Sequence, residues 1–276
     1  MATSRLLMLI DSHCHIDSDR FDDDRDDVVQ RAREAGVSMM LNIGTGDPHS
    51  DDFRKAVAVA EKYDNVFASV GVHPHDAKLY DDMAEQHLID LAKSEKVIAW
   101  GEIGLDFYYD HSPRDVQRDV LRRQIRTARA LALPIIIHSR DADDETVAIL
   151  SAECAGDDFP GGIMHCFGGT PEMATSLMQL GFLISFAGNV TFKKAENLRD
   201  AARVVPLEKL LVETDCPFLT PEPFRGKRNE PAYVEHTAKF LSNFYGVEFD
   251  VLARQTTKNF LEFFKLQAAS SDTSIV

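Results

Sequence analysis

Short and almost continuously apolar runs recur along the chain, separated by longer segments of mixed polarity. Runs of this length that are rich in Val, Ile, Leu and Met are typical of β-strands buried on both faces. The pattern predicts eight strands, at Leu6–Ile10, Ser38–Ile43, Val66–Val70, Val97–Trp100, Pro134–Ile137, Gly162–Met164, Phe182–Phe186 and Lys209–Val212.

The segments between these runs have helical spacing. Apolar residues recur three and four positions apart in 26–36, 51–63 and 114–131. Pro171 and Pro231 stand where further helices are expected to begin. Strands that alternate with helices pair in parallel, and eight such units in 276 residues have the size of a (βα)₈ barrel. We therefore predict an α/β fold, a TIM barrel.

An open, doubly wound sheet is the main alternative fold. Such sheets usually carry a Gly-rich phosphate loop after an early strand, and neither G-x-G-x-x-G nor G-x-x-x-x-G-K-[ST] occurs in the chain. No linker rich in Pro, Gly or Ser divides the sequence. Residues 1–265 are expected to form a single barrel domain, and residues 266–276 a flexible C-terminal tail.

Charge and cysteine content narrow the classes of function. The net charge of −15 argues against broad binding of a polyanion, so any nucleic acid must be attracted locally. The four cysteines form no Cys-x-x-Cys pair, which excludes a zinc ribbon. No apolar run approaches the roughly 20 residues that span a bilayer, and the N-terminus does not look like a secretory signal. We expect a cytoplasmic protein with no membrane partner.

Histidines and acidic residues stand just after the predicted strands. In DSHCHID, His13 and His15 are one residue apart, so an extended backbone points both rings to the same side. Similar residues follow five other strands: His73, His75, Glu102, Asp106, His138, Arg140, Asp141, His165, Glu213 and Asp215. One such histidine can be an ordinary core residue. Barrel active sites, however, lie at the carboxyl ends of the strands, and buried charges must be paired or coordinated. The recurrence predicts a metal site.

The chemistry of this site follows from the number of ligands. Six ligands are too many for one tetrahedral ion with an open position, so we expect two divalent cations that share a carboxylate. Glu102 is the candidate bridge, because a neutral imidazole cannot bridge. One ion is expected on His13, His15 and Asp215, and the other on His138, His165 and Glu102. Two ions would lower the pKa of a shared water toward about 7, and Asp215 could accept its proton.

Several stretches together resemble the TatD family of metal-dependent deoxyribonucleases, within the amidohydrolase superfamily of barrels. They are DSHCHID, GVHPHDA, GEIGLDFYYD, PIIIHSRDA, MHCFGG, FAGNVTFKKA, LLVETDCPFLTP and RGKRNEPAYV. The resemblance covers nearly the whole chain. It implies a TIM barrel of the metallo-dependent hydrolase type that hydrolyses DNA, often as a 3′→5′ exonuclease. The family's ligand positions fall on the same six residues, and the resemblance implies that His73 contacts a substrate phosphate.

Further residues near the strand ends are candidates for binding the substrate. Arg140 could clamp a phosphate or pair with a nearby aspartate. The stretch RGKRNEP after the last strand is a basic island in an acidic chain, and it is either a polyanion contact or a solvated loop. Its cations are Arg225, Lys227 and Arg228. Aromatic residues beside the predicted site could stack on a base or pack in the core: Phe107, Tyr108 and Phe167.

The sequence leaves other functions open. A hydrolase of the same superfamily could act on a small amide, lactone or phosphoester, although Glu102 stands where many of these enzymes use a carboxylated lysine. A non-catalytic metal-binding or partner-binding protein is the third possibility. The two cations could be Mg, Mn or Zn, because histidine ligands favour Zn or Mn while the family resemblance allows Mg. RNA is an alternative to DNA as substrate, and no obligate protein partner is inferred.

Overall fold

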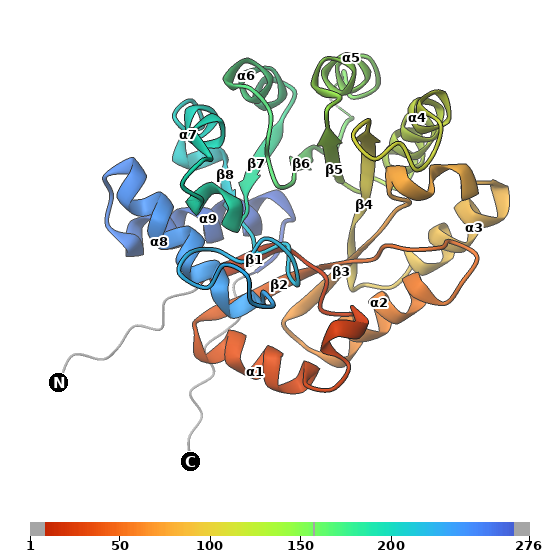
Figure 1. Ribbon diagram of the computed structural model, residues 1–276. Helices are drawn as coiled ribbons and strands as arrows, with labels where there is room; N and C mark the ends of the chain where they lie inside the picture. Colours follow the sequence, from red (N-terminus) through yellow and green to blue (C-terminus); the bar gives the residue numbers. More distant parts are fainter. Residues whose placement is uncertain (1–8, 157, 268–276) are drawn as a thin grey trace.

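A computed structural model describes residues 9–156 and 158–267 of the chain. Its eight strands form one parallel sheet in which neighbours in sequence are neighbours in space. They are β1 (Leu9–Cys14), β2 (Val37–Ile43), β3 (Val66–Val70), β4 (Val97–Asp106), β5 (Ile135–Arg140), β6 (Gly162–Met164), β7 (Phe182–Phe186) and β8 (Leu210–Val212). The strands occupy the centre of the molecule (Figure 1), so the prediction of a TIM barrel is confirmed.

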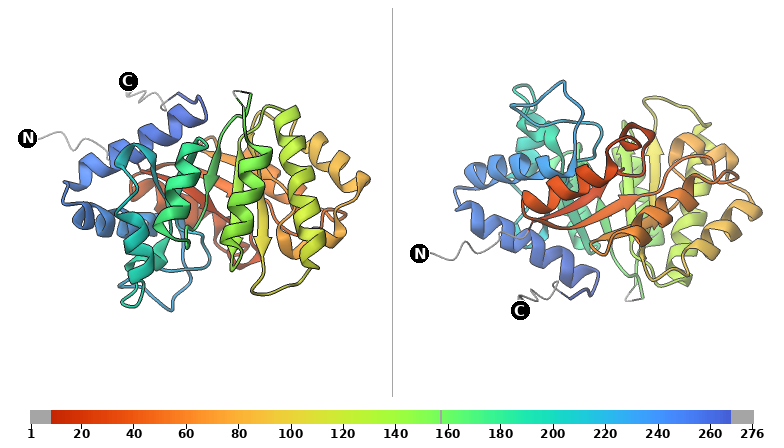
Figure 2. Two further views of the ribbon diagram at one scale, coloured as in Figure 1. Left: turned by 90° about the horizontal axis from the view of Figure 1, so that it is seen from above. Right: turned by 90° about the horizontal axis from the view of Figure 1, so that it is seen from below.

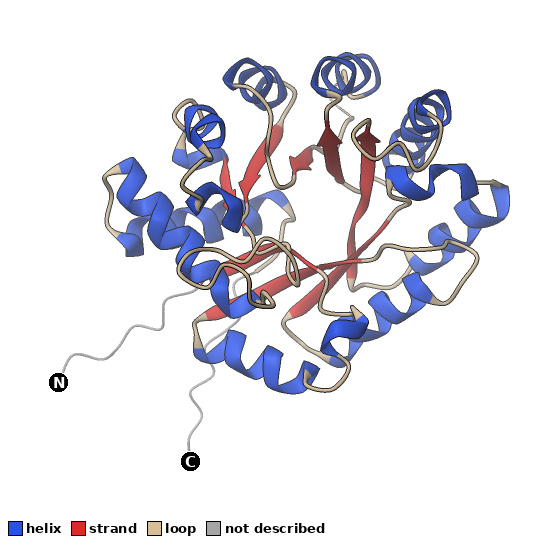
Figure 3. Cartoon of the chain, in the orientation of Figure 1, coloured by secondary structure: helices blue, strands red, loops and turns tan. Residues whose placement is uncertain are grey.

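Helices follow the strands and lie outside them, as the colouring by secondary structure makes clear (Figure 3). They are α1 (Arg25–Glu34), α2 (Asp52–Lys62), α3 (Asp82–Leu91), α4 (Arg114–Ala130), α5 (Asp143–Glu153), α6 (Pro171–Gln179), α7 (Glu196–Ala202), α8 (Val234–Tyr245) and α9 (Phe249–Phe263). Gly36 adopts a φ of +85° just after α1, where a glycine ends a helix at little steric cost. Pro171 begins α6, as predicted.

Hydrogen bonds join β1 to the chain that leaves β8, and this brings the ends of the sheet together. The amide of Asp215 donates to the carbonyl of His13 at 2.9 Å, and the amide of His15 donates to the carbonyl of Cys216 at 2.8 Å. The hydroxyl of Ser12 donates to the carbonyl of Val212 at 3.0 Å. This junction places His13 of β1 and His15, just after β1, directly beside the residues that follow the last strand.

The barrel interior is apolar toward the amino-terminal ends of the strands. Ile10, Leu41, Ile136 and Leu211 belong to one buried cluster inside the barrel, and Phe260 of α9 completes it. The side-chain amide of Asn259, also on α9, donates to the carbonyl of Leu210 at the start of β8. Helix α9 therefore covers the amino-terminal end of the barrel, and the views from above and below show the helices around the sheet (Figure 2). The carboxyl end is left for polar residues.

Parts of two predictions fall outside the described residues, namely 6–8 of the first predicted strand and 268–276 of the predicted tail. Leu266, at the start of that tail, packs against the interior cluster, and its amide donates to the carbonyl of Leu261. Within residues 9–156 and 158–267, no helix is long and apolar enough to cross a membrane.

Candidate metal centre

Three strands are longer at their carboxyl ends than predicted, and the extra residues carry polar side chains of the site. His13 lies in β1, Glu102 and Asp106 lie in β4, and His138 and Arg140 lie in β5. The prediction that strands end where apolar runs end was wrong here. Glu102, Asp106 and His138 are partnered with one another, which offsets the cost of burying them where the backbone ladder continues.

Gly104 explains how closely β4 and β5 approach. It pairs with His138 across the ladder, and a Cβ at this position would overlap the carbonyl oxygen of His138. Its φ of +155° is also one that residues with side chains rarely adopt. A glycine here lets β5 lie against β4, which brings His138 within hydrogen-bond distance of Glu102.

The first cluster of candidate ligands consists of His13, His15 and Asp215. The Nε2 atoms of the two rings lie 3.3 Å apart, and Asp215 Oδ1 lies 3.7 Å from His13 Nε2 and 3.4 Å from His15 Nε2. His15 Nδ1 lies 3.0 Å from the carbonyl of Ile43, which places a proton on Nδ1 and leaves Nε2 facing the cluster. The residues predicted to hold one ion are thus together.

The second cluster surrounds Glu102, which is buried. Its Oε1 lies 2.8 Å from His138 Nδ1, 2.9 Å from His165 Nε2 and 3.6 Å from His73 Nε2. Its Oε2 lies 3.5 Å from His13 Nε2, which belongs to the first cluster. The two oxygens of one carboxylate therefore face two different groups of imidazoles.

The electrostatics of this arrangement favour a cation. Burial opposes ionisation of Glu102, but His165 and His73 and hydrogen bonds from His13 and His138 hold its pKa well below the usual value. Burial acts to raise the pKa of Asp215, but the bond from His15 and the charges of the neighbouring imidazoles together lower it. Burial likewise acts to lower the pKa of His15, yet Asp215 raises it to about 9.

Imidazole nitrogens and carboxylate oxygens are donors that suit Zn or Mn, and these donors converge from five strand ends. The proton that His15 and Asp215 share is one that a bound cation would displace. The residues present therefore fit divalent cations.

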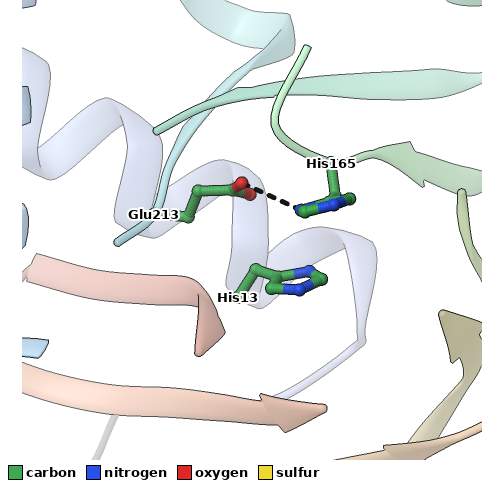
Figure 4. Close-up of side chains that lie close together, drawn as sticks. All are labelled: His13, His165 and Glu213. Carbon is green, nitrogen blue, oxygen red and sulfur yellow. Dashed lines mark hydrogen bonds and ion pairs between the residues drawn. The ribbon is translucent and has the colours of Figure 1, made fainter. Parts of the chain in front are cut away.

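Two carboxylates that the sequence analysis left without a role lie behind the candidate ligands. Asp106 Oδ2 lies 2.9 Å from His75 Nε2 and 3.3 Å from His138 Nε2. Glu213 Oε1 lies 3.1 Å from His165 Nδ1 (Figure 4). Both residues stand just after predicted strands. Their positions in the sequence, however, do not show which ring nitrogen each carboxylate contacts.

His73 and Arg140, the two residues predicted to contact a phosphate near the ligands, have different surroundings. His73 Nδ1 accepts a hydrogen bond from the amide of His75, so the ring carries its proton on Nε2. Arg140 is placed over the rings of Tyr108 and Tyr109, at 4.0 and 4.7 Å, rather than in an ion pair with Asp141 or Asp143.

The cations of the stretch 225–231, the basic loop, contact side chains other than the metal ligands. The guanidinium of Arg225 lies over Phe192 at 4.1 Å, and Lys227 lies over Phe224 at 5.2 Å. Arg228 pairs with Asp24 at 2.6 Å, which ties the loop to the start of α1.

A cleft of about 410 Å³ opens onto both clusters. Its walls contain His15, His73, His75, Glu102, Asp106, Tyr109, His138, Arg140, His165, Asp215 and Phe218. Tyr108 is 57% exposed, whereas Phe107 and Phe167 are buried and serve the core. Phe218, which the sequence analysis missed, is 53% exposed, and the guanidinium of Arg20 lies over its ring at 5.9 Å.

Sequence comparisons place the chain among known metal-dependent hydrolases. The sequence profile described as "TatD related DNase" matches residues 10–265. The Bacillus subtilis "Uncharacterized metal-dependent hydrolase YabD" is 42% identical over 94% of this chain and 100% of its own length. The "3'-5' ssDNA/RNA exonuclease TatD" of Cronobacter sakazakii is 36% identical over 95% of this chain and 99% of its own length.

Comparison with solved structures also finds a TatD homolog. The Escherichia coli K12 TatD homolog YJJV superposes with a TM-score of 0.86 at 30% identity, covering 94% of this chain and 98% of that one. An organophosphorus hydrolase shares the fold alone, at 14% identity and a TM-score of 0.63 over 94% of this chain and 93% of its own. The chain therefore belongs to the family of TatD related DNases, and it is a metal-dependent hydrolase built on a TIM barrel.

Proposed function

We propose that this protein hydrolyses phosphodiester bonds of DNA as a 3′→5′ exonuclease and that it uses two divalent cations. The observation that carries the proposal is the position of Glu102, whose two oxygens face separate imidazole groups. Residues His13, His15 and Asp215 would hold one ion, and His138 and His165 would hold the other with Glu102. When bound, the ions would supply Lewis acidity that lowers the pKa of water and neutralises charge on the phosphate.

The remaining steps belong to the protein's own side chains. Asp215 is ionised at neutral pH because its pKa is lowered, so it can accept the proton of the attacking water. His73 is neutral at that pH, since burial lowers its pKa to about 4. Its Nε2–H can donate to a phosphate oxygen, because Nδ1 is occupied by the amide of His75. A neutral donor fits a site that already gathers positive charge.

A single strand suits the surroundings of the cleft. Tyr108 and Phe218 are exposed aromatic rings, and each lies against an arginine. Bases of a single strand stack on such rings, at about 1–3 kcal/mol per base. The net charge of −15 also favours local rather than general attraction of a polyanion. Relatives named as ssDNA/RNA exonucleases support the same substrate class and leave RNA as a second substrate.

The proposed activity is tested with single-stranded DNA that carries a label at its 5′ end. We expect progressive shortening from the 3′ end in Mg²⁺, Mn²⁺ or Zn²⁺, complete loss of cleavage after EDTA, and recovery when one of these ions is returned. Internal cuts without shortening would contradict the exonuclease assignment. Cleavage of a lactone or phosphotriester with none of DNA would contradict the substrate.

The basic loop is expected to act on binding more than on chemistry. Changing Arg225 and Lys227 together to alanine should weaken binding of an oligonucleotide about tenfold, since two exposed cations contribute roughly 0.5–1 kcal/mol each. Hydrolysis of a small phosphodiester should be unchanged, because it does not reach the loop. The two measurements are oligonucleotide affinity and turnover of bis(p-nitrophenyl) phosphate.

Arg228 is left out of this variant, because its pairing with Asp24 gives it a structural role. The matched control changes Arg254 and Lys258 on α9, two exposed cations on the helix that covers the opposite end of the barrel. Two results would argue against a role of the loop in binding DNA. One is a loss of small-substrate turnover as large as the loss of oligonucleotide affinity, and the other is an equal loss of oligonucleotide affinity in the control variant.

A further inference from the structure

We propose that Glu213 is a positioning residue that orients the imidazoles of His13 and His165 from behind, so that one carboxylate sets the ligand geometry of both ions. The inference rests on the two-metal function proposed above and concerns a residue outside the predicted ligand set.

Glu213 is the first residue after β8, and it is completely buried. Its Oε1 accepts the amide of Cys166 at 2.8 Å and lies 3.1 Å from His165 Nδ1. Figure 4 shows the contact between Glu213 and His165, with the ring of His13 lying alongside the ring of His165. The bond from Cys166 holds the carboxylate, so its orientation toward His165 does not depend on the histidine alone.

The two imidazoles form a nearly parallel stack, with centroids 3.7 Å apart and planes inclined by 17°. Both turn Nε2 toward Glu102, at 2.9 Å from Oε1 for His165 and 3.5 Å from Oε2 for His13. Donor atoms of His13, His165 and Glu213 lie within 4.8 Å of one another. The carboxylate of Glu102 thus faces the Nε2 atoms of both rings, and the carboxylate of Glu213 lies close to both rings.

Two buried atoms of this group have no hydrogen-bond partner within the described residues: His13 Nδ1 and Glu213 Oε2. Buried polar atoms are nearly always paired, directly or through one water. A ring N–H and a carboxylate oxygen are complementary. We therefore assign Oε2 as the acceptor for His13 Nδ1–H, as Oε1 is for His165 Nδ1–H.

This pairing has a direct consequence for both ions. A proton held on Nδ1 leaves the Nε2 lone pair free, and an anionic acceptor behind the ring raises its basicity as a ligand. His13 and His165 belong to different predicted ions, so the loss of Glu213 should weaken both sites. A residue that only supports the fold would not change two dissociation constants in parallel.

The test measures metal binding directly. Metal-free wild type and the full-length Glu213→Gln variant are titrated with Mn²⁺ by calorimetry, and Co²⁺ absorption reports ligand geometry. Glutamine keeps an oxygen for the amide of Cys166 but removes the charge and the second acceptor. Both dissociation constants should rise about 10- to 100-fold, with an altered Co²⁺ spectrum and a cooperative thermal transition.

Asp11→Asn is the matched control. Asp11 is also fully buried beside the same strand junction, but its carboxyl group bonds to Thr214 and to the backbone amide of His13, and to no imidazole ring. This change replaces one carboxyl group of the same layer by an amide whose oxygen can still accept the two backbone bonds, so both dissociation constants should be unchanged. If Glu213→Gln does not fold, Glu213→Asp keeps the charge while moving it away from the rings, and the same parallel weakening is expected.

Several results would overturn the inference. Weakening at one site alone would contradict a shared role, and unchanged binding would contradict any role. Loss of a third ion from the variant would mean that His13, His165 and Glu213 bind a cation themselves. A wild type that binds only one ion would instead contradict the two-metal function, and the shared role with it.

Discussion

Replacing Asp215 with asparagine is expected to lower the rate of DNA hydrolysis by about 10³-fold while the fold is retained. General base catalysis contributes about 10²–10⁴-fold, and asparagine cannot accept the proton of the attacking water. Asp215 Oδ1 faces His13 and His15, and the hydrogen bond from His15 together with the charge of the neighbouring imidazoles keeps its pKa low enough for this role at neutral pH. The rate is measured with 5′-labelled single-stranded DNA at saturating Mn²⁺.

The backbone at this position explains why the variant should fold. Asp215 has a φ of +53°, a conformation in which Asp and Asn are enriched among residues with side chains. Its amide still donates to the carbonyl of His13 across the strand junction. Asp141 offers a matched control, since it has the same φ of +53° and is exposed after β5. Asp141→Asn should have no effect, and turnover of Asp215→Asn at the wild-type level would refute the role of Asp215.

The strands could be predicted best where burial alone decides their length. The predicted bounds of β3, β6 and β7 coincide with the structure, because those runs are apolar to both ends. Prediction failed at the carboxyl ends of β1, β4 and β5, where polar residues continue the ladder, buried in β1 and β4 and partly exposed in β5. Their partners are distant in sequence, so no local pattern could show that burying them is tolerated.

The same physical limit applies to the site. Placement at strand ends was enough to foresee that His13, His15, Glu102, His138, His165 and Asp215 would converge, because parallel strands of a barrel end on one side. It could not foresee that Glu213 lies against the rings or that Arg228 pairs with Asp24. These contacts depend on the direction of a side chain in space. The exposure of Phe218 depends in the same way on the course of a loop.

Replacing Glu102 and replacing Asp215 should differ in the number of bound ions that are lost. Asp215 lies in one cluster, so Asp215→Asn should still bind an ion at Glu102, His138 and His165. Glu102 contributes one oxygen to each cluster, so its replacement should affect both ions. The number of ions retained after dialysis, measured by elemental analysis, therefore separates a bridging carboxylate from a proton acceptor.

Glu102→Gln should lower the hydrolysis rate by about 10³-fold or more and reduce the bound ions from two to one or none. Losing roughly 4 kcal/mol of charge stabilisation in the transition state corresponds to that factor. The variant should also be less stable without metal, because breaking a buried ionic contact typically costs about 3–5 kcal/mol.

The control for Glu102→Gln is Glu208→Gln. Glu208 is exposed and lies just before β8, at the end of the barrel away from the site. Retention of two ions by Glu102→Gln would rule out the bridge, even if activity were lost, because a carboxylate shared by two cations cannot be neutralised without weakening the hold on both. Loss of both ions together with activity is the result that only a shared ligand explains.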